Sequence, residues 1–109
     1  MSKTISFEYD GTPYTLEFTR RTVKDMEATG FKLADIKNKP MTAYPILFRG
    51  AFNCHHKRLD EATTNGIYAS LTDKEGLIEK LVEMYVDTMN TLFEEPGENE
   101  KNVQWKANF

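Results

Sequence analysis

The triplet Cys54-His55-His56 contains the residue types best suited to hold a metal ion or to supply a nucleophile. It includes the only cysteine and both histidines of the chain. Thr42 is predicted to cap a helix that runs through this triplet to Arg58, and neighbouring helical side chains point about 100° apart. The three side chains would then face different ways, and zinc in proteins takes four ligands. We therefore expect no metal site, no bound cofactor and no Cys–His nucleophile here.

The rest of the sequence contains no recognisable catalytic motif. It has no glycine-rich loop for phosphates, no G-x-S-x-G and no H-E-x-x-H. Glu79 and Glu83 lie one turn apart on a predicted helix, a spacing typical of solvated surface rather than of an acid–base pair. The sequence therefore predicts a protein without catalytic residues, not an enzyme.

Charge is distributed unevenly along the 109 residues. Residues 1–60 contain 10 Lys and Arg against 7 Asp and Glu, whereas residues 61–109 contain 4 against 10. Arg20, Arg21 and Lys24 form a small basic group next to a predicted hairpin, and they are candidates for contact with another protein. Neither half is basic enough to predict a nucleic-acid surface, so we do not expect nucleic acid as a partner.

Composition indicates a soluble protein of a reducing compartment. A single cysteine excludes an intrachain disulfide. No stretch approaches the roughly 18–20 apolar residues that cross a bilayer, and the start MSKTISFEYD lacks the apolar core of a signal peptide. We therefore expect a cytoplasmic protein without membrane contact.

Strand-like alternation is confined to the first 18 residues. If the chain folds back on itself at Gly11, the apolar side chains on either side of this turn lie on one face of a two-stranded hairpin. A four-residue loop, Asp10 to Pro13, is expected because proline has no N–H to close a tighter turn. The predicted cross-strand pairs are Tyr9 with Tyr14, Phe7 with Leu16, and Ile5 with Phe18.

This apolar face must be covered by helices, which predicts an α+β fold: an N-terminal antiparallel β-hairpin packed on a bundle of about four helices. The helices are expected over residues 19–30, 42–58, 59–71 and 72–93, the last opened by the capping box Thr72-x-x-Glu75. Neither edge of the hairpin has a mid-strand proline or lysine that would obviously block pairing. A strand from another chain could therefore add to the hairpin, and a second copy of the protein could form a homo-oligomer in this way.

A single domain is predicted over residues 1–94, followed by a flexible acidic tail over residues 95–109. Trp105 is the only tryptophan, and it lies in this polar tail. Two roles stay open for its side chain: it folds back onto the domain, or it anchors a partner groove.

Three runs of the sequence resemble a known family: FEYDGTPYTLEFTRRTVKDMEATGF, KPMTAYPILFRGAFNCHHKR and IYASLTDKEGLIEKLVEMYVDTMNTLFEE. They are similar to the small tail assembly chaperones of long-tailed bacteriophages and of prophages in Gram-positive bacteria. The similarity covers roughly residues 5–95 and consists of hydrophobic and aromatic patterns rather than catalytic signatures.

The resemblance implies a non-enzymatic role. Such chaperones bind the tape measure protein, keep it soluble and recruit tail tube protein subunits around it. It also implies a location in the cytoplasm of the bacterial host and absence from the mature virion. Two alternatives remain open: a structural head–tail joining or tail-completion protein, and a small nucleic-acid-binding regulator that uses Arg20, Arg21 and Lys24.

Overall fold

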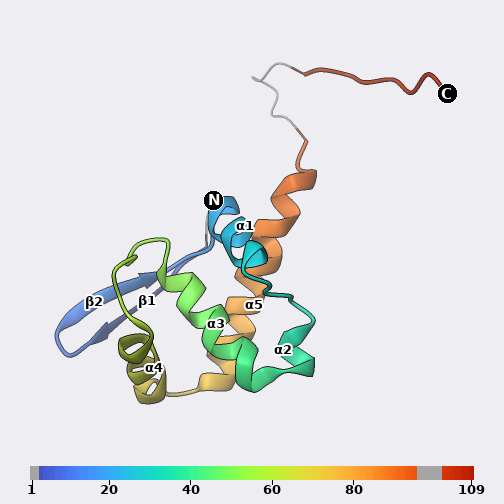
Figure 1. The fold of residues 1–109 in the computed structure, drawn as a ribbon. Coiled ribbons are helices and arrows are strands. Elements are labelled where there is room, and N and C mark those ends of the chain that lie inside the picture. The colour runs from blue at the N-terminus through green and yellow to red at the C-terminus, as the bar shows by residue number, and fades with distance from the viewer. Residues whose placement is uncertain (1–2, 96–101) are drawn as a thin grey trace.

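The structure is a computed structural model that describes residues 3–95 and 102–109. Two antiparallel strands, β1 (Ile5–Tyr9) and β2 (Thr12–Leu16), form the predicted N-terminal hairpin. Five helices and one 3-10 turn follow, and Figure 1 shows the hairpin projecting from one side of the helical body. The predicted α+β architecture, a hairpin on a helical bundle, is confirmed.

The predicted register of the hairpin is wrong by two residues. Ile5 pairs with Leu16, and Tyr9 pairs with Thr12, so only Asp10 and Gly11 form the turn. Both turn residues have positive φ, 51° and 79°, which matches the two-residue turn that Asp-Gly favours. Pro13 does not force the predicted four-residue loop, because it faces Glu8 in a pair that exchanges no ladder hydrogen bonds.

The helices start and stop at slightly different residues from those predicted. Lys39 precedes the third helix, which begins at Pro40, a residue suited to the first helical position, and ends at Phe52. Asp73, not Thr72, caps the last helix, and its side chain accepts from the Gly76 N–H. The bounds are α1 Arg20–Ala28, α2 Asp35–Asn38, α3 Pro40–Phe52, α4 Glu61–Ser70, α5 Lys74–Asn90 and the 3-10 turn η1 Thr91–Phe93.

Helix α3 lies at the centre of the core. Leu47, Phe48, Ala51 and Phe52 are each 0–1% exposed. Phe52 contacts the hairpin directly, because its ring lies edge-on to two aromatic rings there, at 6.0 Å from Phe7 and 5.6 Å from Tyr14 between centroids. The apolar face of the hairpin is therefore packed on the helices, as predicted. Its six large side chains are buried or partly buried against the core: Ile5, Phe7, Tyr9, Tyr14, Leu16 and Phe18.

Within the described residues, the last helical element ends at Phe93. The predicted tail, residues 95–109, falls partly on residues 96–101, which lie outside the described part of the chain. Residues 102–109 are exposed and contain no helix or strand. The division between residues 94 and 95 stays a prediction. Across residues 3–95 and 102–109, no helix combines the length and the apolar character needed to span a membrane.

Candidate functional site

The outer edge of β2 is closed to strand addition. The backbone N–H groups that point outward belong to alternate residues, 13, 15 and 17. Pro13 has no N–H, Thr15 donates its N–H to His56 Nε2 at 3.1 Å, and Glu17 donates its N–H to the carbonyl oxygen of Ala51 at 3.1 Å. The expectation that neither edge is guarded is therefore wrong for β2.

The outer edge of β1 is different. The outward backbone groups of Ser6 and Glu8 have no hydrogen-bond partner within the described residues. Both side chains are exposed, and no helix is hydrogen-bonded along this edge in the same part of the chain. A strand from another chain can therefore pair with the hairpin only through β1.

The contacts that close β2 also fix the turn after α3. His55 and His56 both donate their N–H groups to the carbonyl oxygen of Phe52, at 3.1 and 2.8 Å. The ring of His56 lies edge-on to Tyr14, with 5.1 Å between centroids. Cys54 and its neighbours are thus held in a hydrogen-bonded turn beside β2, not on a helix.

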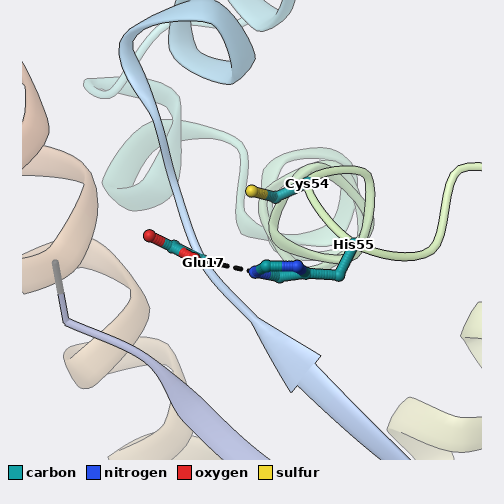
Figure 2. Close-up of side chains that lie close together, drawn as sticks. All are labelled: Glu17, Cys54 and His55. Atoms are coloured by element: carbon teal, nitrogen blue, oxygen red, sulfur yellow. Dashed lines mark hydrogen bonds and ion pairs between the residues drawn. The ribbon is translucent and has the colours of Figure 1, made fainter.

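This turn brings Cys54 and His55 to Glu17, which lies 37 residues earlier than Cys54. Figure 2 shows the three side chains side by side, with the His55 ring directed at the Glu17 carboxylate. His55 Nε2 lies 2.7 Å from Glu17 Oε1, and one donor atom from each of the three residues lies within 4.8 Å of the other two. The prediction that Cys54 and His55 face apart is therefore wrong, since α3 ends before both residues.

The environment of this cluster is polar but sheltered. The Glu17 side chain is 14% exposed and the His55 side chain 42%. Burial raises the pKa of the Cys54 thiol, and the negative charge of Glu17 raises it further, while Lys57 and a hydrogen bond from Thr22 act the other way. The nearby Glu17 carboxylate therefore disfavours the thiolate form of Cys54.

The three basic residues predicted as a protein-contact group point to different places. Arg20 donates to the Thr91 hydroxyl at 2.6 Å and to the Thr91 carbonyl oxygen, which ties the start of α1 to η1. Arg21 lines a groove between α1 and α3, and Lys24 is exposed on α1. Their role in partner contact stays a prediction, and Arg20 already has a structural partner.

The groove between α1 and α3 has a volume of about 730 Å³. Arg21, Arg49 and Lys57 contribute positive charge to its lining, against one carboxylate from Asp25. None of these four charged side chains is buried. The groove is therefore an open, weakly basic surface, not an enclosed pocket that fixes a small ligand.

Exposed apolar side chains concentrate where α5 leaves the core. Met89, Leu92 and Phe93 share one face at helical spacing and are 39%, 71% and 82% exposed. Trp105 is 86% exposed, so it does not pack on the domain in this structure. Sequence reasoning missed a pattern in this tail: apolar Val103, Trp105, Ala107 and Phe109 alternate with polar residues, which is the period of a strand.

Fold and site together define a small α+β domain whose hairpin is fixed, through its second strand, to the end of a central helix. The chain belongs to the family described as Domain of unknown function (DUF5055), which matches residues 1–109. No curated protein and no solved structure matches the chain. The family description names no activity.

Proposed function

We propose that this protein is a tail assembly chaperone of a long-tailed bacteriophage or prophage. In this role it binds the tape measure protein, keeps it soluble and recruits tail tube subunits. It acts in the cytoplasm of the bacterial host, has no catalytic function and is absent from the mature virion. The resemblance of residues 5–95 to such chaperones motivates the proposal.

The observation that carries the proposal is the exposed apolar surface at the end of α5. Met89, Leu92 and Phe93 extend the helix beyond the core, and large exposed apolar side chains mark sites of protein contact. A client with long apolar helices needs such a surface, because its own apolar faces aggregate when they are left in water. Methionine adds adaptability, since its unbranched side chain fits differently shaped partners.

Residues 102–109 supply further exposed apolar side chains. Val103, Trp105 and Phe109 are each more than 80% exposed. Tryptophan is enriched among residues that dominate binding energy at protein interfaces. Within this proposal, the stripe on α5 and η1 forms the first client contact and Trp105 anchors the second.

Self-association belongs to the same proposal, because several copies are needed along a long client. The β1 edge supports it, since β2 is closed by Pro13, His56 and the Ala51 carbonyl group. Two copies would pair their β1 strands antiparallel and form a four-stranded sheet. Light scattering tests this step: dimers or larger species are expected at high protein concentration, and a strict monomer contradicts it.

Co-expression with the tape measure protein tests the client role. The wild-type chain should keep the tape measure protein in the soluble fraction and co-purify with it. The double variant Leu92→Glu, Phe93→Glu should lose both effects, because it places charge on the exposed stripe. The matched control is Met41→Glu, which changes an apolar side chain that is 90% exposed on the first turn of α3.

Two outcomes contradict the proposal. In the first, the tape measure protein is equally insoluble with and without the wild-type chain. In the second, mass spectrometry of purified phage particles finds the chain in stoichiometric amounts, which fits a head–tail joining or tail-completion protein instead.

A further inference from the structure

We propose that Glu17, Cys54 and His55 form a binding site for a divalent transition-metal ion of the Zn²⁺ class, which fastens the hairpin to the end of α3. This site is independent of the proposed function, and its test needs no client protein.

The donor set indicates the kind of metal. A thiolate, an imidazole nitrogen and a carboxylate oxygen are the three ligand types that zinc takes in proteins. Thiolate and imidazole ligands disfavour Mg²⁺ and Ca²⁺, which prefer oxygen. Three protein ligands leave a fourth position for water. Water and the ion can reach the site beside His55, because its side chain is 42% exposed.

The geometry requires only side-chain movement. The three donor atoms already lie within 4.8 Å of one another. Tetrahedral zinc with bonds of about 2.0 to 2.3 Å places its ligand atoms about 3.3 to 3.6 Å apart. Each donor atom therefore shifts by an ångström or so. The His55–Glu17 contact of 2.7 Å opens slightly to admit the ion.

The backbone positions these donors from two separate segments. The Glu17 N–H bonds the Ala51 carbonyl oxygen, and the Thr15 N–H bonds His56 Nε2, so the end of β2 is fixed against the turn. Cys54 and His55 lie two and three residues after Phe52, which is fully buried. The site is therefore largely pre-formed, and binding costs little ordering of the chain.

Electrostatics gives the ion a role. The Glu17 carboxylate and the Cys54 thiol have donor atoms within 4.8 Å of each other and of the His55 ring nitrogen. A divalent cation between the two groups neutralises the carboxylate and the thiolate together, and the thiol releases its proton to water on binding. The bound ion then links the β2–α1 segment to the end of α3 through direct bonds.

The first experiment uses the fact that Cys54 is the only cysteine, so alkylation by iodoacetamide reports on one site. At a free Zn²⁺ concentration ten times the dissociation constant, the alkylation rate of the purified, tag-free wild-type chain should fall about 10-fold. Mg²⁺ should give no protection. Unchanged alkylation over the whole Zn²⁺ titration overturns the proposal.

Variants assign the ligands while keeping the reporting thiol. Glu17→Gln and His55→Gln should each raise the free Zn²⁺ concentration that gives half-maximal protection, by more than the roughly 10- to 100-fold loss of affinity that removal of an outer-sphere partner causes. The matched control is Glu79→Gln, which removes an exposed carboxylate on α5, outside the cluster. Protection that persists in both ligand variants, or is lost in the control, contradicts the assignment.

A second readout does not depend on whether a variant folds. Co²⁺ added to the wild-type chain should produce a thiolate-to-cobalt charge-transfer band and the intense visible bands of a tetrahedral site. Zn²⁺ should displace both. A Co²⁺ spectrum without the charge-transfer band excludes Cys54 as a ligand and overturns the proposal.

Discussion

The contact between Phe52 and Phe7 joins the central helix to the hairpin, and replacing both residues measures how much this contact stabilises the docked hairpin. Phe52 is fully buried at the end of α3, and Phe7 is partly buried at the centre of β1. Their rings meet edge-on at 6.0 Å. A two-stranded ribbon is marginal alone in water, so its stability depends on this interface.

The expected magnitudes follow from burial. Phe52→Ala should lower the free energy of unfolding by about 3–5 kcal/mol, because it leaves a cavity among Phe7, Tyr14 and Phe48. Phe7→Ala should cost about 1 kcal/mol, since half-burial gives roughly half of the 1.5–3 kcal/mol for a fully buried large side chain. The loss of stability in the double variant should be smaller than the sum of the two single losses by about 0.5–1.5 kcal/mol, the interaction energy of an aromatic pair.

Urea unfolding of the wild type, both single variants and the double variant measures these values. With a slope near 2 kcal/mol per molar urea, Phe52→Ala should move the midpoint down by about 2 M. Two results refute the reasoning: a cost below about 1 kcal/mol for Phe52→Ala, or additivity within about 0.3 kcal/mol for a pair in contact.

Three further predictions concern other parts of the fold. Gly50→Ala should destabilise the protein by about 1–3 kcal/mol despite its better helix propensity, because the new Cβ overlaps Met26 Sδ; urea unfolding should also show a smaller cost for Met26→Ala in the Gly50→Ala background. Arg20→Ala should lower the free energy of unfolding by about 1 kcal/mol, because the hydrogen bonds to Thr91 in η1 are lost. Arg21→Ala should change it by no more than about 0.5 kcal/mol, and equal effects of the two variants would contradict this. Hydrogen bonds from Thr63 lower the pKa of Asp60 in the folded protein. The cap therefore stabilises the fold fully above pH 3.8, the ordinary pKa of the group, and this stabilisation is lost as the pH falls through the lowered pKa of the folded state. The difference in free energy of unfolding between wild type and Asp60→Asn should shrink in acid, and a difference that stays constant with pH would argue against the cap.

The sequence was sufficient to predict which face of the hairpin is apolar but not how its strands pair. Alternation of apolar residues depends only on the period of two, so the buried face was predicted correctly. A register shift of two residues keeps the same face and therefore leaves no trace in that pattern. The missing N–H of Pro13 does not disfavour the tight turn, because an N–H is needed only at positions that donate to the ladder.

The Glu17–Cys54–His55 cluster could not be predicted because it depends on where α3 ends. A helix that continues to residue 58 separates Cys54 from His55, whereas a helix that ends at Phe52 lets the turn present both to the hairpin. The stop signal after Phe52 is weak, because it consists of Asn53 with no glycine or proline close behind it. Glu17 also lies 37 residues before Cys54, and local sequence patterns do not predict contacts between segments so far apart.

Hydrogen exchange measured by mass spectrometry, on the chain alone and in complex with the tape measure protein, tests the central functional claim most directly. The proposed chaperone role predicts that binding slows exchange in peptides covering residues 89–95 and 102–109. Exchange in the helical core around Phe48 should stay as slow as before. Complex formation without protection of either segment, or no complex between the purified proteins, would contradict the account.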